Sequence, residues 1–239
     1  MKIRRLPEID LAKFVALNQG YQLEQALHAY NSGGGAWSYD PVRSSTSDIV
    51  GAVTPLYGKL SGVSWEQIKR QIEKSCKRGA DQTKANVEVG KVLYDAVSTY
   101  EWSAAKFHMG RLPIGVGNAV RYWSDVILED GQGIFVPFFD HRREHGIASR
   151  EARRVLFSMQ HIWIRDRHPD LAGARLALVK FPASESGRGL RVEFHDDGEL
   201  IPFSELDARV RFVYETWERV SLEKAHVGKR TGTGGPTLF

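Results

Sequence analysis

Residues 122–143, YWSDVILEDGQGIFVPFFDHRR, contain two largely apolar runs separated by a short polar segment. Two runs of β-branched and aromatic residues flank an Asp-Gly pair, which is a strong short-range signal for a β-hairpin. We therefore predict two strands joined by a turn at residues 129–132. Because apolar residues lie on both faces of these strands, we expect the hairpin inside a sheet that other elements cover.

Apolar residues that recur about every 3.6 positions predict the helices. We expect helices at residues 7–31, with a break at Gly20, at 64–79, 82–100 and 149–167, and after Ser204. Shorter apolar runs predict a strand within 101–121, a strand at 174–181 and a second hairpin formed by 190–194 and 199–203. The order of these elements predicts an α/β (α+β) fold, in which helices flank a central mixed sheet.

Glycine, serine and proline suggest where the chain divides. We predict a helical N-terminal extension with a Gly/Ser-rich loop at 1–63, an α/β core domain at 64–227 and a flexible glycine-rich tail at 228–239. The glycines at 33–35 lack the Gly-Lys-Ser/Thr ending of a phosphate-binding loop, so we expect a simple loop there.

Composition excludes several classes of protein. The 239 residues are 42% hydrophobic and 26% charged, which is ordinary for a globular protein. No apolar run reaches the ~20 residues that a membrane helix needs, and residues 1–20 lack a signal-peptide core. We therefore expect a cytoplasmic protein without a membrane partner. The single cysteine, Cys76, excludes an intrachain disulfide and a cysteine-bound metal cluster.

Positive charge is concentrated in one part of the chain. Residues 141–191 contain eleven Lys and Arg against five Asp and Glu, a net charge of +6, whereas the whole chain carries +4. A local basic field of this kind favours a polyanionic partner, and we predict nucleic acid, either DNA or RNA. The alternative is a solvated helix face. A protein partner or a homo-oligomer also stays open.

The hairpin contains two carboxylates that could do chemistry. Asp125 precedes the first strand, and Asp140 ends the second. A third carboxylate, Glu88, lies on the margin of the apolar stripe of the helix at 82–100. If Leu128 pairs with Gly133, Asp140 lies four residues beyond the partner of Asp125, and Pro137 is expected to mark a bulge that changes this spacing.

The order of elements over residues 82–181 resembles the PD-(D/E)xK, or restriction-endonuclease-like, superfamily of nucleases. The resemblance rests on that order and on five positions: Glu88, Asp125, Asp140, Arg142 and Gln160. It implies a nuclease that hydrolyses phosphodiester bonds with Mg²⁺, a cation that prefers carboxylate and water oxygens.

The resemblance also implies roles for individual residues. Glu88, Asp125 and Asp140 would bind the metal, and Asp125, Asp140, Arg142 and Lys180 would form the catalytic set. The residues that would bind substrate are Gln160, Arg143, Arg153 and Arg154.

One departure from the family pattern puts hydrolysis in doubt. Arg142 stands where the family has lysine, and arginine binds phosphate as a planar fork that stays protonated. The alternative function is a non-catalytic subunit that binds nucleic acid or protein through a basic face at 142–167. In the purely structural interpretation, Asp125 caps a strand end, and Asp140 joins Arg142 and Arg143 in an ion-pair cluster.

Two shorter patterns suggest other chemistry. His141, His145 and His161 would form a metal site if their segment were helical. Residues 228–235, GKRTGTGG, look like the glycine-rich substrate loop of tryptophan 2,3-dioxygenase-type haem enzymes, but Arg219 stands where their axial histidine would fall. A short glycine motif outside its structural context is a weak signal.

Overall fold

A computed structural model shows how these elements are arranged. The structure describes residues 5–17, 20–30, 38–52, 63–115, 119–122, 124–144, 146–185, 187–196 and 198–231. The glycines at 33–35, His145 and residues 232–239 lie outside the described residues.

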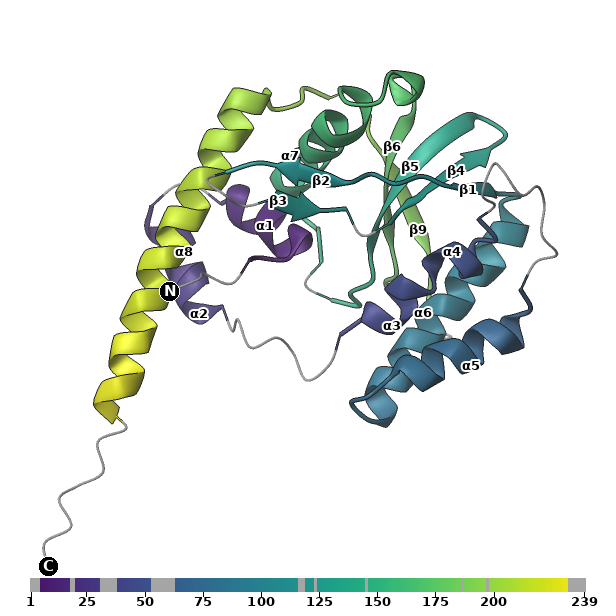
Figure 1. The fold of residues 1–239 in the computed structure, drawn as a ribbon, viewed down its shortest axis with the longest axis horizontal. Coiled ribbons are helices and arrows are strands. Elements are labelled where there is room, and N and C mark those ends of the chain that lie inside the picture. The colour runs from purple at the N-terminus through teal and green to yellow at the C-terminus, as the bar shows by residue number, and fades with distance from the viewer. Residues whose placement is uncertain are drawn as a thin grey trace, which may run out of the picture.

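A mixed five-stranded sheet forms the centre of the molecule (Figure 1). Its order is β1 (Ser103–Lys106), β4 (Val126–Asp130), β5 (Gly133–Asp140), β6 (Arg175–Lys180) and β9 (Arg191–Phe194). Only β5 and β6 run parallel, because helix α7 (Arg150–Gln160) crosses between them. The other neighbouring pairs are antiparallel. The predicted mixed sheet is therefore confirmed.

The central hairpin is confirmed, but its predicted register is wrong. Asp130 pairs with Gly133 and Leu128 with Phe135, so the turn has two residues instead of four. The Asp130 carboxylate accepts a hydrogen bond from the backbone N–H of Gln132 at 2.8 Å, which closes the turn earlier than expected. Pro137 marks no bulge, because β5 pairs without interruption with β6 from Phe135 to Asp140.

Side chains on the two faces of β5 and β6 pack into two separate hydrophobic cores. Val136 and Phe138 face one cluster, and Phe135 and Phe139 face the other. Helices α1 (Glu8–Val15), α7 and α8 (Phe203–Thr231) cover the first face (Figure 1). Helices α5 (Trp65–Ser75) and α6 (Ala80–Thr99) cover the second. Two helical layers therefore enclose the sheet, as the apolar pattern of the hairpin predicted.

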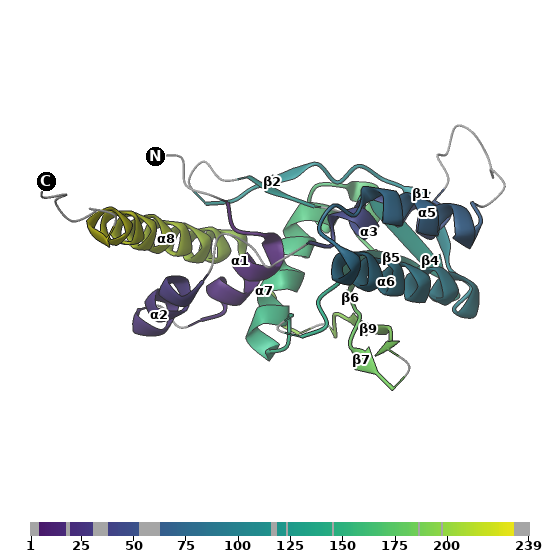
Figure 2. The same cartoon turned by 90° about the horizontal axis from the view of Figure 1, so that it is seen from below.

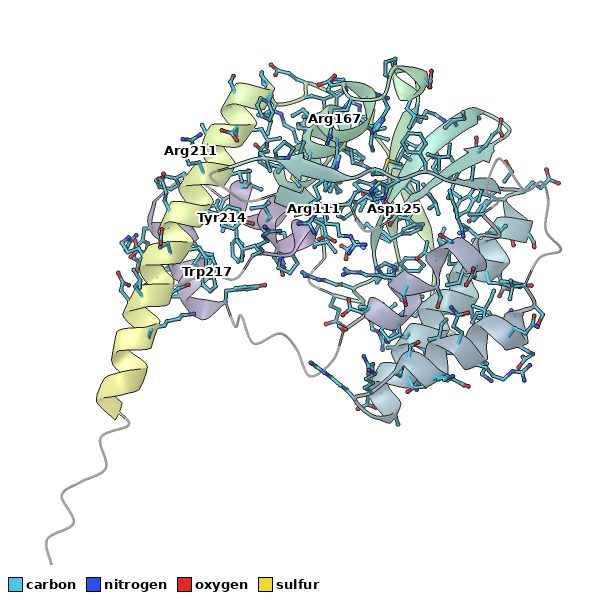
Figure 3. The ribbon with its side chains drawn as sticks, in the orientation of Figure 1. Arg111, Asp125, Arg167, Arg211, Tyr214 and Trp217 are labelled. Atoms are coloured by element: carbon cyan, nitrogen blue, oxygen red, sulfur yellow. The ribbon has the colours of Figure 1, made fainter. Side chains whose placement is uncertain are left out.

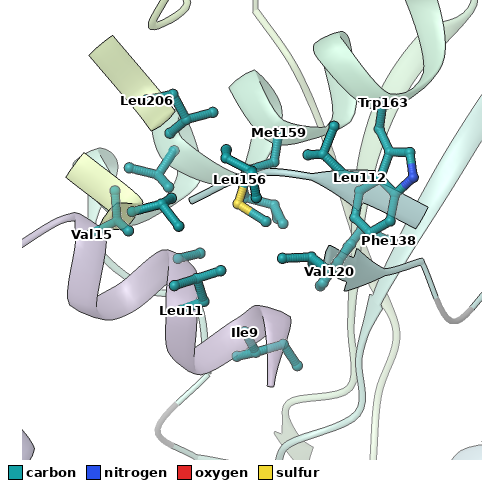
Figure 4. Close-up of a cluster of buried hydrophobic side chains, with 14 of the residues drawn as sticks. Ile9, Leu11, Val15, Leu112, Val120, Phe138, Leu156, Met159, Trp163 and Leu206 are labelled. Carbon is teal, nitrogen blue, oxygen red and sulfur yellow. The ribbon is translucent and has the colours of Figure 1, made fainter. Parts of the chain in front are cut away.

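The first core joins segments that lie far apart in the sequence (Figure 4). Leu11 and Val15 of α1 meet Leu156 and Met159 of α7 and Leu206 of α8, and all five are almost fully buried. Helix α2 (Tyr21–Ala29) adds Leu23 and Leu27 to the same cluster. The segment predicted as an N-terminal extension thus contributes directly to the packing beside the sheet.

The sequence signals at helix starts are confirmed. Ser64 and Gln67 form the predicted capping box of α5. The Ser149 hydroxyl accepts a hydrogen bond from the N–H of Ala152 at 3.1 Å and caps α7. Gly20, with a φ of 113°, separates α1 from α2, as predicted.

Several predicted boundaries differ from the structure. Two short helices, α3 (Asp40–Ser44) and α4 (Thr46–Ile49), occupy a predicted loop, because Asn86 of α6 accepts a hydrogen bond from the N–H of Val42. The predicted strand within 101–121 comprises β1 and a small hairpin of β2 (Arg111–Pro113) and β3 (Ala119–Arg121). The helix predicted to Arg167 continues after α7 as a π-helical turn, His161–Arg165.

The end of the described chain also differs from the prediction. No strand forms at 199–203, where the N–H of Ile201 instead binds the Ser158 hydroxyl of α7 at 2.8 Å. A separate two-stranded hairpin forms from β7 (Ala183–Ser184) and β8 (Gly187–Arg188). Residues 228–231, predicted as flexible tail, belong to α8, and the rest of the tail lies outside the described residues.

No described helix combines the length and the apolar run that crossing a bilayer requires.

Candidate functional site

Asp140 ends β5 and organises the loop that follows. It is 2% exposed, and its two carboxylate oxygens accept hydrogen bonds from the backbone N–H groups of Arg142, at 3.3 Å, and Ile147, at 2.7 Å. Gly146 packs so closely that an added Cβ would lie 2.1 Å from a carboxylate oxygen. Both oxygens of Asp140 are therefore used to hold the loop 141–147.

Asp125 has a similar role before β4. Its carboxylate accepts a hydrogen bond from the N–H of Met109 at 3.2 Å and lies 3.5 Å from Nδ1 of His108. Its own carbonyl accepts a hydrogen bond from the N–H of Phe107 at 3.0 Å. Asp125 thus fixes the chain that leaves β1, as the strand-cap interpretation expected.

Arg142 is paired within the chain. Its guanidinium lies 2.6 Å from the Asp10 carboxylate of α1, which also accepts a hydrogen bond from the Tyr30 hydroxyl at 2.9 Å. Burial alone would lower the pKa of Arg142, but the hydrogen bond and negative charge of Asp10 outweigh it and raise that pKa above its ordinary value. Arg142 ties the loop after β5 to the N-terminal helices.

Most of the other predicted catalytic and substrate-binding cations are also paired. Lys180 lies 2.9 Å from Glu193, and Arg153 lies 3.8 Å from the same carboxylate. Arg154 donates a hydrogen bond to the carbonyl of Glu199 at 2.9 Å. Arg143 is exposed to solvent.

Gln160 lies in the core and does not reach the surface. Its side-chain amide donates hydrogen bonds to the Tyr122 hydroxyl at 2.9 Å and to the carbonyls of Val136 and Ala177 at 3.3 and 3.4 Å. The Tyr122 hydroxyl donates in turn to the carbonyl of Pro137 at 2.7 Å, and burial raises the pKa of Tyr122. Gln160 therefore joins α7 to strands β5 and β6.

The predicted metal ligands do not form a cluster. Within the described part of the chain, the group of three ligand atoms close enough to share an ion belongs to Glu24, His28 and Glu223 instead of Glu88, Asp125 and Asp140. In that group, Arg219 already lies 2.7 Å from Glu24 and 3.4 Å from Glu223. The predicted histidine cluster is not assembled by the described residues either, because His161 pairs with Asp166 at 3.3 Å and His141 is enclosed separately.

His141 occupies an aromatic box that the sequence did not reveal. Its ring stacks on Phe181, with centroids 5.4 Å apart and planes 5° apart, and on Tyr39 at 5.8 Å. Neither ring nitrogen has a hydrogen-bond partner among the described residues. Burial lowers the pKa of His141 well below 6.5, and the positive charges of Arg43 and Arg188 lower it further.

A groove of about 750 Å³, lined mostly by charged and hydroxyl-bearing residues, opens on another part of the surface. Helices α3, α4 and α5, the turn after α5 and the end of β3 form its walls. Its charged lining residues are Arg43, Lys74, Lys77, Arg121, Asp40 and Asp125. The sequence places Lys74 and Lys77 on the outer face of the predicted helix. It contains no signal that Arg43 and Arg121 lie beside them, because these residues belong to distant segments.

Helix α8 extends beyond the body of the molecule (Figure 1). Its first half is anchored by buried side chains, including Tyr214 and Trp217, which Figure 3 shows facing the neighbouring helices. Farther along, Lys224 still donates hydrogen bonds to the carbonyls of Leu27 and Tyr30 at the end of α2. The last turns then carry the chain away from the sheet.

Comparison with known proteins identifies a different family from the predicted nuclease superfamily. A family model described as "SocB: Sliding clamp-binding bacterial toxin SocB" matches residues 9–227. The chain is similar to the DNA replication inhibitor toxin SocB of Caulobacter vibrioides (strain NA1000 / CB15N), with 35% identity over 236 residues and 98% of each chain covered. No solved structure matches the chain significantly.

These matches overturn the predicted nuclease. The resemblance to PD-(D/E)xK enzymes rested on about 100 residues and on short, tolerant motifs, whereas the toxin family matches almost the whole chain. Hydrolysis of nucleic acid and a Mg²⁺ cofactor have no support, and no solved structure supports a restriction-endonuclease-like assignment of the mixed sheet. Two of the three carboxylates that suggested metal binding, Asp125 and Asp140, accept hydrogen bonds from backbone N–H groups of neighbouring loops instead.

Proposed function

The chain belongs to the SocB family of sliding clamp-binding bacterial toxins, and we propose that it inhibits DNA replication by binding the sliding clamp. The observation that carries this proposal is the 35% identity to a DNA replication inhibitor toxin, which extends over 98% of both chains. A match of this extent covers the helices on both faces of the sheet as well as the sheet itself. A protein partner was one of the alternatives that the sequence left open.

The proposed target also bears on the predicted cellular compartment and on the predicted nucleic-acid partner. Bacterial replication takes place in the cytoplasm, so a clamp-binding toxin acts in the compartment predicted from the sequence. The predicted nucleic-acid partner is not part of what these matches support, and it stays a prediction.

We assign the contact with the clamp to α8 and to residues 232–239, which follow it in the sequence, and we call this segment of the chain the arm. The helix leaves the body after its contacts with α2 (Figure 1). The sequence then continues as GTGGPTLF, in which Leu238 and Phe239 are the large apolar residues among small and polar ones. Aromatic and large apolar side chains supply most of the binding energy in protein interfaces, so these two residues are the candidate anchors.

Induction of the chain in a bacterial host tests the function. We expect incorporation of labelled thymidine to stop soon after induction, before protein synthesis declines, because replication requires a free clamp. Overproduction of the clamp should restore incorporation by mass action. Continued thymidine incorporation in cells that contain the intact chain would contradict the proposal.

A pair of variants separates the arm from general effects. Leu238→Ala with Phe239→Ala should relieve the inhibition. The matched control, Tyr21→Ala with Ile134→Ala, also removes two exposed apolar side chains, which are 74% and 40% exposed and lie outside the arm on α2 and β5. The control should inhibit like the unchanged chain. Equal inhibition by all three proteins would reject the assignment to the arm and leave the function standing.

A further inference from the structure

A row of aromatic rings runs along the face of the sheet that α5 and α6 cover. Phe135 of β5 contacts Trp102 and Phe194 edge to face, and each pair of ring centroids is 5.5 Å apart. Tyr100 then stacks on Trp102, with centroids 5.3 Å apart and planes 24° apart. The two outermost rings are exposed, by 50% for Tyr100 and 38% for Phe194. The row therefore connects a buried core to two aromatic surfaces.

At its Phe194 end, the row already carries a cation. The guanidinium of Arg175 lies over the rings of Phe194 and Phe135, 4.6 and 5.5 Å from their centroids. The carboxylate of Asp130 pairs with the same guanidinium. An aromatic face beside a carboxylate suits a guanidinium, because the ring attracts the charge and the carboxylate neutralises it. Arg175 is thus an example, within the fold, of the cation that such a site accepts.

The Tyr100 end has the same two kinds of group without a cation from the described residues. Glu101 is exposed, and its carboxylate has no ion-pair or hydrogen-bond partner in the described chain. No described Lys or Arg lies over the ring of Tyr100 or Trp102. Glu129, which is also exposed, pairs across β1 and β4 with Ser103 and adds a second carboxylate close by. This end of the row is therefore acidic as well as aromatic.

The backbone at Glu101 is strained. Helix α6 ends in a Schellman motif, in which the N–H of Trp102 donates to the carbonyl of Val97 at 2.9 Å and that of Glu101 to Ser98 at 3.4 Å. The residue at this position of the motif is usually glycine, because its backbone is left-handed. Glu101 has a φ of 53° and is the one non-glycine residue with a positive φ in the described part of the chain. A carboxylate thus stands beside the exposed ring where glycine would fold more easily.

The strand that follows lies at the edge of the sheet. β1 comes first in the strand order, and the strand that pairs with it among those described is β4. The N–H of Phe107 donates to the carbonyl of Asp125, so by the alternation of an antiparallel ladder the backbone groups of Ala104 and Lys106 point away from β4. Such an edge accepts an extended segment as an added strand. Lys106 lies at the end of β1 that is farther from Glu101.

We propose that the aromatic edge, which comprises Tyr100, Glu101, Trp102 and β1, binds an extended, arginine-bearing segment of a protein partner. The backbone of that segment pairs with β1 as an added strand. One of its arginines contacts the aromatic face and the carboxylate in the way that Arg175 does at the other end of the row. Glu129 adds negative charge on the opposite face of the strand, so a basic segment is favoured over an acidic one. This surface is separate from the arm.

Fluorescence anisotropy of short labelled peptides with the full chain tests the inference. The test peptide alternates threonine and arginine. In one control peptide citrulline replaces arginine, which removes the charge and keeps the shape. In the other, proline replaces threonine, which keeps the charge and prevents strand pairing. We expect saturable binding of the test peptide, and binding of both controls that is weaker by about fivefold or more.

Two tyrosine variants test the aromatic contact. Tyr100→Ala should weaken binding of the test peptide by about fivefold, because the arginine loses its aromatic face. Tyr21→Ala is the matched control, since this tyrosine is 74% exposed on α2, away from the aromatic edge. It should bind the peptide like the unchanged chain.

Glu101→Gly separates binding from stability. Glycine relieves the left-handed backbone, so the midpoint of urea unfolding should rise, whereas loss of the carboxylate should weaken peptide binding by about fivefold. Glu101→Gln should weaken binding to a similar extent without the gain in stability. Glu73→Gln, which removes an exposed carboxylate of α5, is the control and should leave binding unchanged.

The inference fails if the unchanged chain shows no saturable binding up to about 1 mM peptide, or if the control peptides bind as well as the test peptide. It also fails if the Glu101→Gly variant is more stable and still binds the peptide fully, because Glu101 then has no role in binding. Clamp binding by the Tyr100 and Glu101 variants should be normal. Failure of peptide binding with intact clamp binding rejects only the aromatic edge, and absence of clamp binding by the unchanged chain rejects the proposed function.

Discussion

At the level of single residues, the imidazole of His141 combines near-complete burial with two ring nitrogens that lack a hydrogen-bond partner in the part of the chain that the structure describes. Such a group is stable in the core only in its neutral form. Arg43 and Arg188 reinforce this preference by their positive charge, and Tyr39, Phe139 and Phe181 surround the ring. Protonation of His141 therefore costs more free energy in the folded state than in the unfolded chain.

The pH dependence of stability should reveal this histidine. The folded pKa lies below the unfolded value of 6.5, so between them the unfolded chain binds more protons and stability falls as the pH falls. One such group contributes a slope of at most about 1.4 kcal/mol per pH unit to the free energy of unfolding. His141→Phe should flatten the dependence below pH 6.5 in urea unfolding.

Phenylalanine suits this test because it keeps the stacking on Phe181 and removes both orphan nitrogens. At neutral pH the substitution should change the free energy of unfolding by less than about 1.5 kcal/mol. The unchanged chain, unfolded in urea over the same pH range, provides the comparison. The same pH slope in the His141 variant and the unchanged chain would show that the buried imidazole is not its source.

Gly146 is a second residue whose substitution should clearly lower the stability of the fold. Alanine at this position would place a methyl group 2.1 Å from the Asp140 carboxylate, so the loop must shift and weaken the two hydrogen bonds that its backbone N–H groups donate to that carboxylate. We expect Gly146→Ala to lower the free energy of unfolding by about 1–3 kcal/mol. Gly173→Ala is the control, since a Cβ there meets nothing within 4 Å. Chemical denaturation of the two variants gives the comparison, and equal stability would contradict the packing described.

The sequence identified Asp125 and Asp140 as unusual residues but did not reveal their roles. A carboxylate at a strand end suits a metal ion and a backbone cap equally well, and the choice depends on which N–H groups the next loop turns toward it. For Asp140 that donor is Ile147, seven residues away, in a loop without regular structure. The aromatic box of His141 was also not predictable from the local sequence, because Tyr39 comes from a segment about 100 residues earlier.

At the level of elements, Gln160 connects α7 to the two parallel strands. Gln160→Leu leaves the carbonyls of Val136 and Ala177 without this donor, and the lost hydrogen bonds should cost about 1–3 kcal/mol of stability. Thermal unfolding measures the effect, with the exposed Gln132→Leu as the control. Clamp binding by the folded Gln160 variant should be normal. A stable variant that fails to bind would instead give Gln160 a direct role in function.

The strongly periodic elements were predictable, and the short ones were not. Helices α5, α6 and α7 follow from their apolar stripes and from the caps Ser64 and Ser149. Helices α3 and α4 have the Pro, Ser and Asp content of a loop, and they depend on Asn86, which bonds to the backbone of both Ser38 and Val42. Their formation is a tertiary effect that a local pattern does not contain.

At the scale of the whole molecule, a helical layer covers each face of the sheet and α8 projects from one side (Figure 2). The predicted order of elements led to the wrong family, because one mixed sheet can serve unrelated functions. Similarity across nearly the whole chain decides the family where the order of elements does not.

The most direct test of the central claim is the equilibrium binding of the purified chain to the purified bacterial sliding clamp, measured by biolayer interferometry without DNA. We predict saturable binding that Leu238→Ala with Phe239→Ala weakens by at least about tenfold, a loss of roughly 1.4 kcal/mol or more. The Tyr21→Ala with Ile134→Ala control, whose substitutions lie outside the arm, should bind like the unchanged chain. No binding by the unchanged, folded chain at any clamp concentration would contradict the assignment of this protein as a clamp-binding inhibitor of replication.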